Sequence, residues 1–266
     1  MRKTEISDGG KLTALLDEIE GVNGIITMDN SAKLELNVTD GYTKKLTMNA
    51  EDVNAPAQDD DLAVQGSGVI EKTGDGTLRI LAAAEGLVCA ESFVVSSGRL
   101  DYKGYFTGAV LVGGSEADAV FSPGNSVGDA YVDGDVSIIN NGVALFEFGT
   151  HPDGEYPDDD SNHDVLYITN GDFSAGDRMI SLYFEEADEA DWSYEGCKYL
   201  LVSGAGLPEG DYTSWLYNYK DLFSLLSESN NLYLVYPLPE PVPEPSTWAL
   251  LALGVVVLFL CKRVRN

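Results

Sequence analysis

Short runs of alternating apolar and polar residues fill most of the chain from residue 24 to residue 236. Residues 33–38 read Lys-Leu-Glu-Leu-Asn-Val, and residues 45–48 read Lys-Leu-Thr-Met. Alternation with a period of two is typical of a β-strand that buries one face. Asp-Gly, Asn and Gly residues separate these runs and indicate turns. The pattern predicts an all-β fold.

Two stretches depart from this alternation. Leu12, Leu15, Leu16 and Ile19 follow one another at helical spacing, which predicts a short helix over residues 11–19. A second short helix is expected over residues 219–226.

A repeat becomes visible when the Gly-x-Leu units are aligned. Gly76-Thr77-Leu78 and Gly98-Arg99-Leu100 lie 22 residues apart. One coil of a parallel β-helix takes about that length, and it buries its aliphatic side chains along a common axis. We therefore expect a parallel β-helix, or solenoid-like stalk, with a C-terminal β cap. A β-sandwich also gives short strands and glycines and is the alternative. The side chains expected to face inward are Leu78, Ile80, Leu100, Val110 and Val136.

The last thirty residues differ from the rest. Prolines alternate through residues 237–245, which favours a stiff, extended spacer. Residues 248–261 are uncharged, and Lys262, Arg263 and Arg265 follow them. Fourteen helical residues rise about 21 Å against a hydrocarbon core of about 30 Å, so the span is short. We expect a single transmembrane helix over residues 247–261. The positive-inside rule then places the tail in the cytoplasm and the bulk of the chain outside.

The order of Pro-Glu-Pro, apolar segment and basic tail closely resembles the PEP-CTERM sorting signal of exported bacterial proteins. The resemblance implies an exosortase-type enzyme as processing partner, a membrane or cell-surface location, and exopolysaccharide as a further candidate partner. The residues of the signal are Pro243, Glu244, Pro245, Ser246, Lys262, Arg263 and Arg265.

Other strands resemble a second family. Residues 72–78, Lys-Thr-Gly-Asp-Gly-Thr-Leu, look like the signature of autotransporter-associated β-strand repeats, and residues 95–100 look like the companion strand. Residues 123–128, Pro-Gly-Asn-Ser-Val-Gly, and the strand at residues 164–169 resemble the segments that follow such repeats. This resemblance implies a passenger-like β stalk.

The charge of the chain is unevenly distributed. All 44 acidic residues and 13 of the 16 basic ones precede the apolar segment, which gives the outer part a net charge of −31. Such a surface repels phosphate backbones, so no nucleic-acid partner is expected. It suits divalent cations or neutral and cationic glycans. Cys261 lies in the apolar segment, so Cys89 and Cys197 are the only pair that could form a disulfide outside it, and two cysteines define no framework.

Residues 151–164 are rich in oxygen ligands of the kind that calcium prefers. The candidate ligands are Asp153, Glu155, Asp158, Asp160, Asn162 and Asp164. An EF-hand is excluded, because His163 stands where that loop needs glycine and Thr169 where it needs glutamate. An irregular calcium site and a solvated acidic loop are the two interpretations. No other cofactor is expected.

Signals for catalysis are weak. Residues 124–128 fit the Gly-x-Ser-x-Gly nucleophile pattern around Ser126, but a strand is expected where that motif needs a helix. The acids are too numerous to select a catalytic pair, and no notable basic residue is expected beside them. We therefore predict a non-catalytic surface or matrix protein. The alternatives are a polysaccharide-active β-helix enzyme, a lyase or glycosidase, and a calcium-dependent adhesin.

The expected organisation has five parts. They are an N-terminal segment with a short helix (1–23), a β-solenoid repeat region (24–150), a C-terminal β region (151–236), a proline-rich spacer (237–245) and the anchor (243–266). Residues 4–11 follow Met1-Arg2-Lys3 without the apolar region that a secretory signal requires. Either the start codon is misassigned or the chain is the C-terminal piece of a longer or broken reading frame, and we expect the second.

Overall fold

The computed structural model describes nine stretches of the chain: residues 3–6, 9–15, 24–48, 62–82, 88–114, 118–124, 127–149, 162–184 and 198–236. All of them belong to one compact unit, residues 1–236, and residues 237–266 make up a second unit. Within the described residues, every regular element is a β-strand except one 3₁₀ turn, η4 (Thr213–Trp215). The predicted all-β fold is confirmed.

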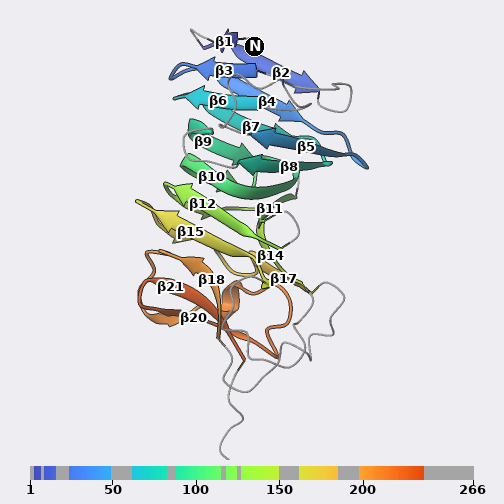
Figure 1. Cartoon of the computed structure of the whole chain (residues 1–266). Coiled ribbons are helices and arrows are strands. Elements are labelled where there is room, and N and C mark those ends of the chain that lie inside the picture. Colours follow the sequence, from blue (N-terminus) through green and yellow to red (C-terminus); the bar gives the residue numbers. More distant parts are fainter. Residues whose placement is uncertain are drawn as a thin grey trace, which may run out of the picture. The chain divides into compact units, whose positions relative to one another are not determined.

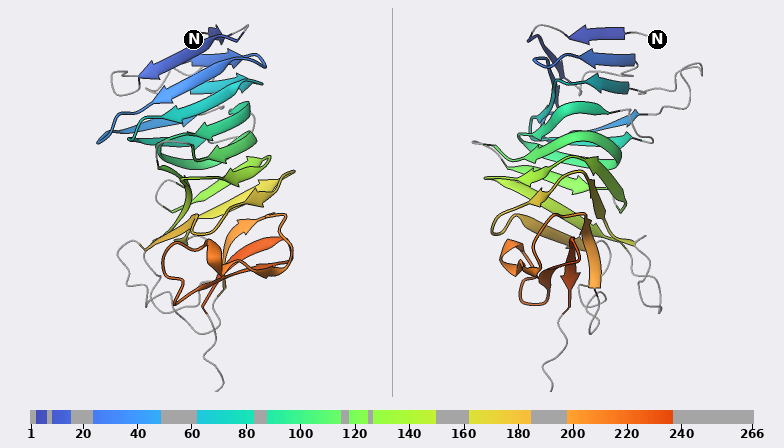
Figure 2. Two further views of the ribbon diagram at one scale, coloured as in Figure 1. Left: turned by 180° about the vertical axis from the view of Figure 1, so that it is seen from behind. Right: turned by 90° about the vertical axis from the view of Figure 1, so that its left-hand side faces the viewer.

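The strands form three ladders in which neighbours run parallel, and Figures 1 and 2 show them stacked along the unit. The first ladder has two parts. Strands β1 (Lys3–Ile6), β3 (Gly24–Met28) and β6 (Leu62–Gly66) form a separate three-stranded sheet, and the middle of β10 (Gly98–Val112), β12 (Asp129–Asp133), β15 (Val165–Thr169) and β18 (Lys198–Ser203) pair in sequence, with an isolated bridge from Val64 of β6 to Val88. The second contains β2 (Lys11–Leu15), β4 (Lys33–Asn37), β7 (Val69–Thr73), β9 (Cys89–Val95), the end of β10, β13 (Val136–Ile138) and β16 (Phe173–Ser174). The third contains β5 (Thr43–Met48), β8 (Thr77–Ala82), the start of β10, β11 (Ala119–Pro123), β14 (Gly142–Phe148) and β17 (Ile180–Phe184).

The chain visits the three ladders in turn. Strands β3, β4 and β5 are followed by β6, β7 and β8, each paired in parallel with the strand three places earlier. The long strand β10 contributes to all three ladders, because its first part pairs with β8, its middle with β12 and its end with β9 and β13. Each return to a ladder adds one layer to the stack.

The pairing changes direction at the C-terminal end of the unit. There β18 pairs antiparallel with β21 (Asn231–Val235), β21 with β20 (Ser224–Glu228), and β20 with β19 (Gly210–Asp211). Figure 1 shows these strands in orange beside the last layer of the ladders.

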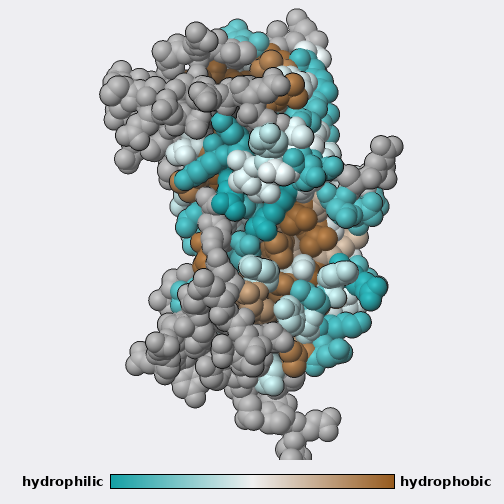
Figure 3. Space-filling model, turned by 90° about the vertical axis from the view of Figure 1, so that its right-hand side faces the viewer, coloured by the Kyte–Doolittle hydropathy of each residue, from teal (hydrophilic) through white to brown (hydrophobic). Residues whose placement is uncertain are grey.

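The hydrophobic core runs through the interior of the stack. Leu78 and Leu100 are direct register partners, so the 22-residue offset is a pairing register. All five side chains expected to face inward are buried, with exposed fractions of 4% or less. Aliphatic burial of this kind is the main favourable term in folding, at about 25 cal/mol per Å². The outer side is mixed, and Figure 3 shows polar and apolar surface next to each other on one face.

Both helix predictions are wrong. Residues 11–15 form β2, whose residues pair one by one with Lys33–Asn37 of β4. Residues 224–228 form β20, which pairs with β21. In both places, backbone pairing with a neighbouring strand outweighs the local helical spacing.

Candidate functional site

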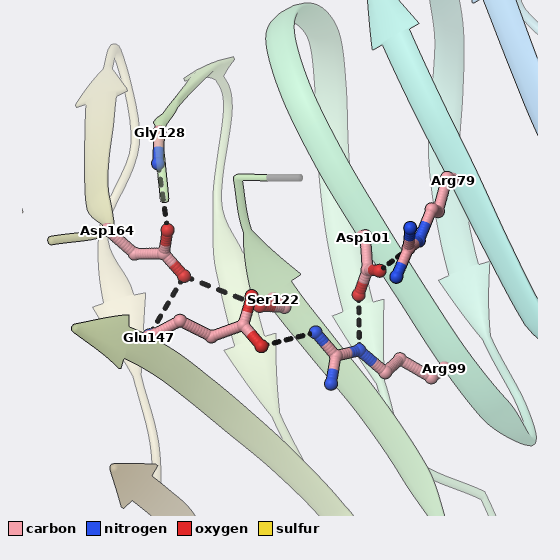
Figure 4. A network of polar contacts seen from close by, with 7 residues as sticks. All are labelled: Arg79, Arg99, Asp101, Ser122, Gly128, Glu147 and Asp164. Atoms are coloured by element: carbon pink, nitrogen blue, oxygen red, sulfur yellow. Dashed lines mark hydrogen bonds and ion pairs between the residues drawn. The ribbon is translucent and has the colours of Figure 1, made fainter. Parts of the chain in front are cut away.

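Six side chains form a polar network on the outer side of the third ladder (Figure 4). They alternate along their strands with buried residues such as Leu78 and Leu100, which point inward. The members of this outer polar network are Arg79 on β8, Arg99 and Asp101 on β10, Ser122 on β11, Glu147 on β14 and Asp164 just before β15.

Arg99 lies at the centre of the outer polar network. Its Nε donates to the carboxylate of Asp101, and its Nη2 donates to Oε1 of Glu147 at 2.8 Å. The Nε of Arg79 donates to the other oxygen of Asp101 at 3.0 Å. Asp101 is fully buried and is the register partner of Arg79 and of Ser122. Two guanidinium groups therefore balance two carboxylates, which is what buried charges require.

Asp164 connects three parts of the stack. Its Oδ1 accepts the backbone N–H of Gly128 at 3.0 Å, and its Oδ2 accepts the backbone N–H of Glu147 at 2.9 Å and the hydroxyl of Ser122 at 3.4 Å. Burial raises the pKa of Asp164 to about 9, against the opposing effect of the two N–H groups, and the charge of Glu147 adds to the rise. The side chain is therefore mostly neutral at pH 7.

The calcium hypothesis can be compared with the structure at two of its six residues. Asn162 is half-buried, and Asp164 is buried, with its oxygens engaged as described above. Asp153, Glu155, Asp158 and Asp160 lie outside the described residues, so the set stays a prediction. Within the described stretches, no group of three or more His, Cys, Asp or Glu side chains is placed to hold a metal ion.

Ser126, the discounted candidate nucleophile, also lies outside the described residues. The segment after it, residues 129–133, forms β12, so the helix that a nucleophile elbow needs is replaced by a strand. Of the two histidines, His163 is buried with its Nε2 2.8 Å from the carbonyl oxygen of Leu200, and His151 is not described.

The expectation that no basic residue flanks the acids is wrong, because Arg99 contacts both Asp101 and Glu147. Part of the outer polar network could be predicted from the sequence. Arg79 and Asp101 lie 22 residues apart, the same offset as Leu78 and Leu100, so the repeat alignment places them side by side. Arg99 and Glu147 lie 48 residues apart and share no such offset.

The Lys-Thr-Gly-Asp-Gly-Thr-Leu segment forms a packed turn between β7 and β8. The fully buried Lys72 donates from Nζ to the carbonyl oxygens of Thr73 and Gly74, and at 3.0 Å to that of Ser97 in the next layer. A Cβ added to Gly74 would lie 2.3 Å from the carbonyl oxygen of Val38, so only glycine fits there. The lysine and the glycine of this segment thus hold successive layers together.

Three tyrosines are stacked on the outer side of the first ladder. The ring centroids of Tyr105 and Tyr131 are 4.7 Å apart, and those of Tyr131 and Tyr167 are 4.8 Å apart, with nearly parallel planes. Burial, together with the carboxylate of Asp129, raises the pKa of Tyr131 to about 12. These tyrosines are register partners, so their stacking follows directly from the pairing of parallel strands.

The residues of the predicted sorting signal, 243–246 and 262–265, lie outside the described residues, as does the expected transmembrane helix at 247–261. The described part of the chain contains no helix long and apolar enough to cross a bilayer. Cys89 carries a free thiol, and Cys197 is not described.

Comparison with known families identifies one feature of the tail. Residues 241–264 match the family model described as a PEP-CTERM protein-sorting motif. The motif implies processing by an exosortase-type enzyme and a secreted, membrane-anchored or cell-surface protein. No curated protein and no solved structure matches the chain.

Proposed function

We propose that the chain is an exported, non-catalytic surface or matrix protein in which a β-solenoid stalk is displayed by its C-terminal sorting motif. The match of residues 241–264 to that motif, directly after a compact β unit that ends at residue 236, carries the proposal. The bulk of the chain is then outside the cell, where exopolysaccharide is a candidate partner.

The pairing pattern supports the stalk. Parallel pairing runs from β2 through β10 to β18, and β1, β3 and β6 form a second parallel sheet, so each layer needs only its neighbours for backbone hydrogen bonds. The Lys72 turn supports the passenger-like resemblance, because the residues that carry it interlock adjacent layers. Side chains of the outer polar network are engaged with one another, as in a structural cluster.

The proposal is tested by following the full chain, fused to a secretory signal peptide, in a Gram-negative host with and without an exosortase. We expect a shorter product on the cell surface only when the exosortase is present. The triple variant Pro243→Ala, Glu244→Ala and Pro245→Ala should stay unprocessed, whereas Pro237→Ala, outside the motif, should behave like the wild type. Processing that is independent of the motif would contradict the proposal.

A polysaccharide-active enzyme is the second candidate, and one observation favours it. Arg99 lies beside two carboxylates, and Asp164, with its raised pKa, hydrogen-bonds to the backbone of Glu147. A lyase or glycosidase needs an acid and a base of this kind. Incubation of the full chain with neutral and acidic polysaccharides distinguishes the two functions. Release of new ends that Glu147→Gln abolishes would establish the enzyme and exclude the non-catalytic protein.

The calcium-dependent adhesin is tested in the same preparation by the effect of calcium and of a chelator on cell attachment.

A further inference from the structure

Glu147 has an oxygen that the protein does not use. Its Oε1 accepts from Arg99 at 2.8 Å, but its Oε2 has no hydrogen-bond partner among the described residues. The residue is only 8% exposed. A buried carboxylate oxygen without a donor is costly, and native structures avoid it or supply the donor from outside the chain.

Two neighbours of Glu147 are accessible from outside. Arg99 keeps 29% of its side chain exposed, and its Nη1 makes no hydrogen bond within the described part of the chain. Tyr183 is the register partner of Glu147 on β17, so both side chains emerge on the same face of adjacent strands. Tyr183 is 51% exposed.

The chemistry of this group favours one kind of ligand. Glu147 offers an acceptor, Arg99 a donor and Tyr183 an aromatic ring. The charges of Arg79 and Arg99 are balanced by those of Asp101 and Glu147, so the group has no excess charge with which to attract a phosphate or a metal ion. A ligand that donates and accepts through adjacent groups and also has an apolar ring face fits all three.

We propose that Glu147, Arg99 and Tyr183 form a binding subsite for a neutral sugar residue of a polysaccharide. One sugar hydroxyl donates to Oε2 of Glu147, a neighbouring oxygen accepts from Nη1 of Arg99, and the sugar ring packs on Tyr183. Because Oε2 is buried in the unliganded protein, the side chain of Glu147 must shift outward for the hydroxyl to reach that oxygen. The inference rests on the proposed function only for the source of the glycan, the surrounding matrix.

Binding of soluble oligosaccharides tests the subsite separately from export and processing. The full chain is kept in a detergent without sugar groups and titrated calorimetrically with neutral glucan and mannan oligosaccharides, and with an oligogalacturonate for comparison. We expect saturable binding of at least one neutral oligosaccharide and weaker binding of the charged one. Glu147→Gln and Tyr183→Ala should each weaken binding by about tenfold or more, as expected for loss of a hydrogen bond to a charged group or of an aromatic contact.

Tyr42→Ala is the matched control, because Tyr42 is 58% exposed and lies in the turn between β4 and β5, away from this group. Its binding should equal that of the wild type, and circular dichroism and thermal unfolding verify that each variant folds. If Glu147→Gln fails to fold, the binding measured for Tyr183→Ala tests the subsite instead. Tyr183 is half exposed, so its removal should leave the fold intact. Absence of binding by all neutral oligosaccharides, or equal losses in Tyr183→Ala and Tyr42→Ala, would overturn the subsite. Surface display of the chain would be unaffected by that result.

Discussion

Asp164 shows how one buried carboxyl links the stability of the unit to pH. Its pKa is about 9 in the folded chain and about 3.9 in an unfolded one. The folded state therefore binds more protons than the unfolded state between these values. By linkage, the contribution of Asp164 is fully present below about pH 4 and is lost as pH rises toward 9.

Asp164→Asn should remove this dependence, because an amide keeps an acceptor oxygen and cannot ionise. We expect the variant to gain stability relative to the wild type as pH rises from 5 to 9, by up to about 1.4 kcal/mol per pH unit. Urea unfolding at pH 5, 7 and 9 measures the difference. Asp211 serves as the control. The hydroxyl and N–H of Thr213 lower the pKa of Asp211, so its contribution to stability is lost only as pH falls. A stability difference between the wild type and Asp164→Asn that does not change with pH would contradict the raised pKa of Asp164.

Lys72 is a second residue with an effect beyond its own strand. Lys72→Met keeps the volume of the side chain and removes the donor to three carbonyl oxygens, so we expect a loss of ~2–4 kcal/mol in the free energy of unfolding. Lys45, on β5, is exposed, and Lys45→Met should change stability by less than ~0.5 kcal/mol. Chemical denaturation of the two variants provides the comparison. If Lys72→Met and Lys45→Met were equally stable, the buried lysine would not hold the layers together.

At the scale of the strand, close stacking makes some glycines irreplaceable. Gly104 has a φ of +104° and is the register partner of Ala82, and an added Cβ would lie 1.8 Å from the carbonyl oxygen of Ala82. Gly104→Ala must therefore push β10 away from β8. We expect a loss of at least ~3 kcal/mol. Gly41→Ala, where a Cβ meets nothing within 4 Å, should cost only the strain of a positive φ, about 1 kcal/mol. Thermal unfolding that is equally affected in the two variants would contradict this packing.

The strands were predictable from the sequence where alternation and a constant offset coincide, as at Leu78 and Leu100. The offset varies elsewhere, because register partners are 21 residues apart between Leu100 and Phe121 but 36 apart between Ala144 and Ile180. The contact between Arg99 and Glu147 depends on these unequal layers, so no fixed period reveals it. The helix prediction at residues 11–15 was wrong for another reason. Its leucines fit helical spacing, and only the pairing with β4 selects a strand.

At the scale of the whole molecule, the distribution of charge predicts the orientation of the chain across the membrane. The part before residue 246 carries −31, whereas the three charged residues after it are all cationic. Cations are retained on the cytoplasmic side of a bilayer. With this predicted orientation the acidic surface lies outside, where neutral ligands approach it without repulsion.

Cysteine labelling of the unprocessed chain tests this orientation. The three native cysteines are first replaced by serine, and a single cysteine is then introduced as Asp60→Cys or as Asn266→Cys. Because the acidic part is expected outside and the tail inside, an impermeant thiol reagent should label the first variant on intact spheroplasts and the second only after the membrane is permeabilised. A cysteine-free chain measures background, and total thiol after solubilisation shows that both sites react. Labelling of Asn266→Cys on intact spheroplasts, with Asp60→Cys protected, would reverse the topology and with it the proposal that the β unit is displayed at the cell surface.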